Sequence, residues 1–266
     1  NGKTITAEYS FPVYKSKEQY LREVEKAKAN TPDVFLLSRE NEEKAIEYIE
    51  RNFKIINEVS DTVTDKNIKE IDFGNLGELS ETIPQDILFE YFERSRGQRS
   101  RSLKLMEREL KDFLKDVHKH GFINKSLEDL KTDNVFLDLS PNEKSIYPAE
   151  YLTDNISFRE KFEESLKPDL DDLEYRISEK FLGGIAEPNF IFSEELTEKA
   201  ASLAAKNVPR TEGVVKKGTK LISSGEPLNK DKINKLQSYL KSDLLRRSSI
   251  VDIWHFAGSI IHGFEK

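Results

Sequence analysis

The chain of 266 residues contains no cysteine. Disulfides, thiolate nucleophiles and cysteine-ligated zinc sites are therefore excluded. No run of eighteen apolar residues occurs, so no membrane-spanning helix is expected, and no signal peptide is visible. The sequence begins at Asn1 without a methionine, and we interpret it as a piece of a longer protein. If that protein is exported, its export signal lies outside this piece.

Apolar residues are also scarce. They make up 36% of the chain and charged residues 34%, against roughly 45–50% and 25% in an average globular domain. Sixteen Phe and nine Tyr can still form a core. The net charge is −7, which disfavours binding to nucleic acid because a polyanion would be repelled.

Sequence patterns that carry chemistry are missing as well. No glycine loop that cradles phosphate and no serine-nucleophile motif occurs. His118 and His120 stand two residues apart, which does not place both on one helical face, so we interpret them as helix-end residues rather than metal ligands. The acidic group at 169–172 lacks the spacing of a calcium loop and is typical of a helix start. We therefore predict no catalytic residue, no metal and no cofactor on this chain.

Periodicity predicts a mainly helical protein. Apolar stripes at three- and four-residue steps predict helices at 45–56, 103–117 and 170–181. Gly121 is expected to end the second of these helices, and Gly183-Gly184 is interpreted as a helix C-cap. Two pairs, Ser16 with Gln19 and Ser157 with Glu160, resemble capping boxes.

Strand patterns are fewer and shorter. Residues 11–14, 34–37 and 135–139 are candidate strands. Residues 211–228 read as a β region with turns at Gly218 and Gly225. A helix from about 229 to 247 follows. The apolar stretch 250–264 could pack on the body as a terminal helix, lie in a membrane interface, or approach a transmembrane helix.

The two ends of the chain resemble each other. Residues 16–30 and 193–207 each predict an alanine-containing helix that ends near a proline and leads to a strand. We expect both to contribute to one α/β lobe, formed by residues 4–60 and 186–248, with a mainly helical insertion at 61–185. Residues 249–266 would be an apolar juxtamembrane segment. The predicted class is α+β, predominantly helical.

Four arginines gather between two predicted helices, around Gly97-Gln98: Arg94, Arg96, Arg99 and Arg101. Guanidinium groups bind anions bidentately, so a phosphate or an acidic ligand could dock there. The alternative is a solvated basic connector that balances the acidic helices.

The two ends of the chain also resemble a known family. Residues 188–200, PNFIFSEELTEKA, and the following 207–226 resemble the extracellular domain of membrane-anchored HD-type phosphodiesterases. Residues 11–15 and 30–35 resemble the beginning of the same domain, while the middle matches weakly. The resemblance implies a structural role for seven motif residues: Pro32, Pro188, Asn189, Asn207, Pro209, Gly218 and Gly225.

The resemblance implies a setting. In such proteins one transmembrane helix precedes this domain, and a multi-helix membrane region and a cytoplasmic HD domain that hydrolyses cyclic di-AMP follow it. The family's metal site needs adjacent His-Asp, and no histidine here is followed by aspartate. We therefore expect an extracytoplasmic, non-catalytic sensor or regulatory domain. Its partners would be its own transmembrane region and HD domain, an unidentified outside ligand or protein, and possible second copies of itself. The alternative is a structural or protein-binding ectodomain that engages envelope components.

Overall fold

The computed structural model describes residues 4–262 apart from 65–66, 74–75, 141–142 and 224–225. The chain divides into two compact units. We call residues 1–29 with 200–266 the terminal lobe and residues 30–199 the central unit. The boundaries predicted from the sequence, 4–60 with 186–248 and 61–185, differ from this division. The structure groups the third strand and the first long helix with the middle of the chain, because they pack there.

The terminal lobe is built from both ends of the chain. Its elements are β1 (Ile5–Thr6), β2 (Phe11–Tyr14), α1 (Lys17–Ala29), β7 (Thr211–Val215), β8 (Lys220–Ile222) and α10 (Lys230–His262). β1 pairs with β8 and β2 pairs with β7, both antiparallel. Phe11 is buried in the small apolar core between these strands and α10. Tyr239 of α10 stacks on Tyr9 at 5.3 Å, and the backbone N–H of Tyr14 donates to Ser238 Oγ at 2.9 Å.

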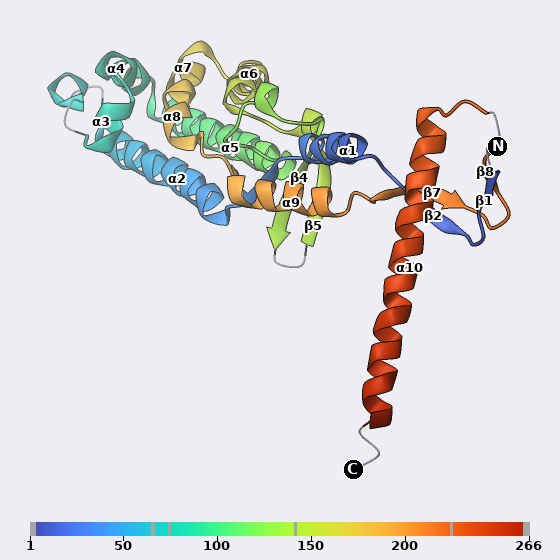
Figure 1. Ribbon diagram of the computed structural model, residues 1–266. Helices are drawn as coiled ribbons and strands as arrows, with labels where there is room; N and C mark the ends of the chain where they lie inside the picture. The colour runs from blue at the N-terminus through green and yellow to red at the C-terminus, as the bar shows by residue number, and fades with distance from the viewer. Residues whose placement is uncertain (1–3, 65–66, 74–75, 141–142, 224–225, 263–266) are drawn as a thin grey trace. The chain divides into compact units, whose positions relative to one another are not determined.

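α10 continues as one helix to His262 (Figure 1). The predicted helix at 229–247 and most of the apolar stretch at 250–264 therefore belong to the same element. The side chains of residues 249–262 and the whole of 263–266 lie outside the described part of the structure. Whether that stretch packs on the body or meets a membrane stays an open prediction.

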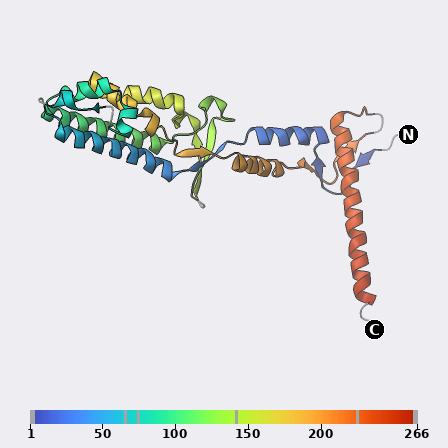
Figure 2. The same ribbon diagram turned by 90° about the vertical axis from the view of Figure 1, so that its left-hand side faces the viewer.

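The central unit holds the long helices. In chain order its elements are β3 (Val34–Leu37), α2 (Arg39–Thr62), η1 (Ile68–Glu70), α3 (Glu78–Thr82), α4 (Gln85–Glu93), α5 (Arg96–His120), η3 (Leu127–Asp129), β4 (Asn134–Ser140), β5 (Glu143–Pro148), η4 (Ala149–Tyr151), α6 (Asn155–Leu166), α7 (Asp172–Lys180), α8 (Leu182–Ile185), β6 (Phe190–Phe192) and the start of α9 (Glu194–Lys206). α2 and α5 lie side by side in both views (Figures 1 and 2). The predicted apolar stripes form their contact, and Phe53, Met106 and Leu110 are buried in it.

A four-stranded sheet stands at one end of this helical bundle (Figure 2). Its order is β5-β4-β3-β6, with β3 parallel to β4 and antiparallel to β6. Gly121 ends α5 at φ +102°, as predicted. The chain then turns directly into Phe122, which is buried in the helical core, and Ile123, which is buried in the core under the sheet.

The N-terminal and C-terminal parts of the chain pair in nested order. β1 pairs with β8, β2 with β7 and β3 with β6. The first, second and third strands of the chain thus pair with the last, the second-last and the third-last. The first two pairs belong to the terminal lobe and the third to the central unit. The predicted class, α+β and predominantly helical with a small β-containing lobe made from both ends, is confirmed.

Two local predictions are wrong. Ser157 is not an N-cap: α6 starts after Asp154, whose carboxylate accepts from the Ser157 N–H at 2.9 Å and from the Leu127 N–H at 3.1 Å. Gly183 and Gly184 are not a C-cap, because they lie inside α8 with φ values outside the left-handed region. Gly184 instead makes room for Tyr48, whose ring carbons would lie 2.2 Å from an added Cβ.

Candidate functional site

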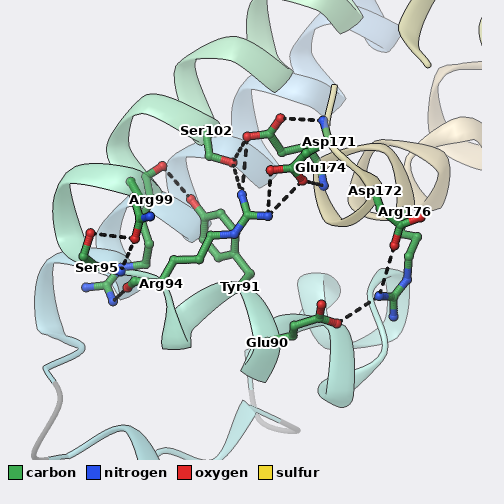
Figure 3. A network of polar contacts seen from close by, with 11 residues as sticks. Glu90, Tyr91, Arg94, Ser95, Arg99, Ser102, Asp171, Asp172, Glu174 and Arg176 are labelled. Carbon is green, nitrogen blue, oxygen red and sulfur yellow. Dashed lines mark hydrogen bonds and ion pairs between the residues drawn. The ribbon is translucent and has the colours of Figure 1, made fainter. Parts of the chain in front are cut away.

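The four arginines of the predicted anion site lie where α4 ends and α5 begins, and Figure 3 labels Arg94 and Arg99. Ser95 starts α5 with a capping box: its backbone N–H donates to the Gln98 side chain at 3.0 Å. This box fixes where the helix begins and therefore which way each following arginine points. The structure places the four side chains in three different environments.

Arg99 is buried, with 3% of its surface exposed. Its guanidinium donates five hydrogen bonds. Nη1 reaches the carbonyl oxygens of Phe92 and Arg94 at 2.8 Å, Nη2 those of Ser60 and Val63 at 3.2 and 2.9 Å, and Nε the Ser60 hydroxyl at 3.0 Å. These carbonyls stand at the C-terminal ends of α4 and α2, where the last turn of a helix lacks intrahelical partners and carries partial negative charge. Arg99 thus caps two helices at once.

Arg94 joins α4 to α7. Figure 3 shows its guanidinium reaching both carboxylate oxygens of Asp171 at 2.8 Å and, from Nη1, Glu174 at 3.4 Å and Ser102 at 3.2 Å. Ser102 in turn donates to Glu174 at 2.6 Å. Burial alone would raise the pKa of Asp171, but its hydrogen bonds with Arg94 and with the N–H of Glu174 outweigh this and lower the pKa. Asp171 also caps α7, so one carboxylate holds both a helix start and an arginine.

Arg96 and Arg101 are exposed. Arg96 pairs with Asp61 at 2.8 Å on the surface. The structure therefore does not bring the four arginines together as one cluster facing solvent: Arg99 and Arg94 are engaged by the protein itself. Anion binding by the remaining two stays a prediction.

Asn189 shows what the family-like motif does locally. Its buried side chain accepts from the Phe122 N–H at 2.8 Å and donates to the His118 carbonyl at 2.9 Å. It therefore bridges the two backbone groups on either side of the Gly121 turn. The neighbouring Pro188 carbonyl accepts from the Asn41 side chain at 2.8 Å. Asn189 thus fastens the end of α5 to the segment that leads into β6, and Pro188 fastens α2 to the same segment.

The other motif residues lie at turns and helix ends. Pro32 leads into β3 beside the fully buried Asp33, which pairs with Lys125 at 2.6 Å. Asn207 and Pro209 are exposed between α9 and β7. Gly218 adopts φ +86° in the β7–β8 turn and donates to the Ala7 carbonyl at 2.8 Å. The predicted turn at Gly225 lies outside the described residues.

His118 and His120 contact different backbone carbonyls. His118 is buried, and its Nε2 lies 3.1 Å from the Glu187 carbonyl, which makes Nε2 the protonated nitrogen. Burial lowers the pKa of His118, which therefore stays neutral. His120 turns back to the Asp116 carbonyl at 2.9 Å. Within the described residues no group of three or more His, Asp or Glu side chains could hold a metal ion.

The terminal lobe carries a feature that sequence reasoning missed, an open hollow of about 690 Å³. It is lined by β7, β8 and the start of α10, and four lysines border it: Lys216, Lys220, Lys232 and Lys235. Lys232 pairs with Glu226 and Lys235 with Asp231. A signal was present in the sequence, since residues 200–266 alone hold twelve Lys and Arg against six Asp and Glu.

The fold and these sites define a predominantly helical α+β domain. Two of the four arginines of the predicted anion site, Arg94 and Arg99, bind groups of the protein itself. Among the described residues, no helix combines the length and the apolar character needed to cross a membrane. The family model described as 7TM-HD extracellular matches residues 2–243, and the chain belongs to this family. It is the extracellular domain of a seven-transmembrane HD protein, as the resemblance implied. No match was found among curated proteins or among solved structures.

Proposed function

We propose that this domain is the sensor or regulatory part of a membrane-bound phosphodiesterase whose cytoplasmic HD domain hydrolyses cyclic di-AMP. The domain itself catalyses no reaction. In this proposal a ligand or protein outside the membrane binds the domain, and the change in the domain biases the membrane helices and, through them, the enzyme.

One observation carries the proposal. The matched domain begins and ends in the terminal lobe, while the central unit is inserted between two parts of that lobe. Both ends of the matched region therefore lie in one unit, and the second unit is continuous in sequence between its two parts. This order suits a receptor module whose central unit meets the outside and whose lobe connects to the membrane part. Proteins of this family carry an HD domain, and in this proposal that domain is the enzyme that the signal regulates.

The experiment compares cyclic di-AMP hydrolysis by the full-length protein with that of a version lacking the domain, both in membranes and at equal expression. We expect the rate to change on deletion. The control replaces the histidine of the HD pair, which should abolish hydrolysis in both backgrounds. An unchanged rate after deletion, under every envelope condition tried, would refute the regulatory role.

The isolated chain provides a second test. It should leave cyclic di-AMP intact, because the catalytic metal site belongs to another domain. Any hydrolysis by the purified chain that survives a metal chelator would contradict the proposal. A purely structural or protein-binding ectodomain remains the competing function. Saturable thermal stabilisation of the isolated chain by a small molecule would speak for the sensor.

A further inference from the structure

The formal charge of the protein is divided unequally between its two units. The terminal lobe holds eighteen Lys and Arg against ten Asp and Glu, a net charge of +8. The central unit holds twenty-four against thirty-nine, a net charge of −15. The overall charge of −7 conceals this division. An anionic surface would therefore attract the lobe and repel the central unit.

Two of the lysines that border the hollow are available to an external anion. Lys216 and Lys220 are both exposed, and within the described residues neither forms an ion pair. Lys217, exposed between them in the sequence, lies in the same β7–β8 turn, which is closed by the Thr219 N–H donating to the Lys216 carbonyl at 3.1 Å. The turn therefore holds three ammonium groups on a short, fixed piece of backbone.

The acidic side chains at the hollow are already engaged. Glu212 accepts from Gln19 at 2.8 Å and from Asn234 at 3.1 Å. Asp231 accepts from Lys235 one helical turn along α10. These contacts leave Lys216 and Lys220 as the groups with free hydrogen-bonding capacity toward an anion.

An apolar side chain stands among the lysines. Val214 is 69% exposed on β7, two residues before Lys216. A small soluble anion gains nothing from such a neighbour. A lipid surface does, because it offers phosphate to the ammonium groups and the boundary of its acyl chains to the valine. The matched family is the extracellular domain of seven-transmembrane HD proteins, and both ends of the matched region lie in this lobe.

We propose that the β7–β8 turn and the adjoining lysine-lined hollow bind the phosphate groups of anionic phospholipid headgroups, which docks the terminal lobe on the membrane surface. The proposal rests on family membership and does not depend on cyclic di-AMP hydrolysis. It can therefore fail while the regulatory function stands, and the reverse also holds.

The test measures binding of the purified chain to vesicles by co-sedimentation. We expect binding to vesicles of phosphatidylcholine mixed with phosphatidylglycerol, and little binding to phosphatidylcholine alone. Each lysine near an anionic surface contributes about fivefold to binding at low salt, so the variant K216Q/K217Q/K220Q should bind about a hundredfold more weakly. High salt should remove most of the difference, since these charges are exposed.

The matched control removes the same three charges from exposed positions of the central unit, K69Q/K104Q/K119Q. It should bind like the parent chain, and circular dichroism should show both variants folded. Equal loss in the two variants would overturn the proposal, as would equal binding to both kinds of vesicle. Loss of inorganic phosphate binding in K216Q/K217Q/K220Q, with vesicle binding unchanged in that variant, would reveal a small-anion site and overturn lipid docking.

Discussion

Arg99 gives the most direct test of how the central unit is held together. In the variant Arg99→Met a side chain of similar reach keeps the packing, but the donors to four backbone carbonyls and one hydroxyl are lost. The charge of Arg99 is met by neutral oxygens, mainly the carbonyls at the ends of α2 and α4. Two helix C-termini, each carrying about half a negative charge, can together balance one guanidinium.

The size of the effect follows from these contacts. Five hydrogen bonds to a charged group would be worth more than about 7 kcal/mol if each gave its usual contribution. Removing the guanidinium also recovers its desolvation cost, and water can enter to reach some of the carbonyls. A buried acceptor left without a donor costs about 1–3 kcal/mol, and with two or so carbonyls left dry we expect Arg99→Met to lower the free energy of unfolding by about 3–5 kcal/mol.

Urea unfolding followed by circular dichroism measures this loss. The control is Arg101→Met, an exposed arginine two residues along the same helix, which should change the free energy of unfolding by no more than about 0.5 kcal/mol. Arg99→Lys should fall between, because an ammonium offers three donors without the planar fork. A loss below about 1 kcal/mol for Arg99→Met, or equal losses for Arg99→Met and Arg101→Met, would refute the capping role.

Three further predictions concern the central unit. Gly184→Ala should destabilise it by about 1–3 kcal/mol because the added Cβ meets the Tyr48 ring. Gly183→Ala, whose added Cβ has nothing within 4 Å, should be neutral or slightly stabilising. Thermal unfolding of the two variants measures the difference. Asn189→Leu leaves the Phe122 N–H and the His118 carbonyl without a partner, so it should lower the free energy of unfolding in urea by about 2–4 kcal/mol. A smaller loss than in the exposed control Asn207→Leu would contradict this bridging role. His118, whose pKa is lower in the folded state than the ordinary value of about 6.5, binds a proton more readily when unfolded. Its contribution is therefore complete above about pH 6.5 and is lost as the pH falls below it, by up to about 1.4 kcal/mol per pH unit. Urea midpoints measured across this range should fall less steeply in His118→Gln, and identical slopes would count against His118 as the titrating group.

The helices and the inner strands could be predicted because their signals are local. Residues 34–37 were expected as a strand from four consecutive apolar residues, and β3 has these bounds. β5, from Glu143 to Pro148, carries no comparable pattern and exists because β4 offers it an edge to pair with. The sequence did not predict β5 because strand propensity depends on packing against neighbouring strands, which a local pattern does not contain.

The arginines show where such reasoning stops. Their spacing and charge allowed an anion site or a solvated basic connector, and no local pattern distinguishes Arg99 from Arg101. The partners of Arg99 at Ser60 and Val63 are backbone atoms more than thirty residues away. Backbone carbonyls are present at every residue, so the sequence carries no mark of which ones a guanidinium will find. Only the packing of α2 against α5 selects them.

The division of the chain bears on how a signal could leave the central unit. Two segments of chain join it to the terminal lobe, one after Ala29 and one after Lys199. The first follows the last residue of α1 and is not helical, whereas the second lies inside α9, a single helix with residues in both units. A hydrogen-bonded helix resists bending and twisting more than an extended segment does, because each turn is held by its own backbone bonds. α9 is therefore the stiffer of the two segments that join the units.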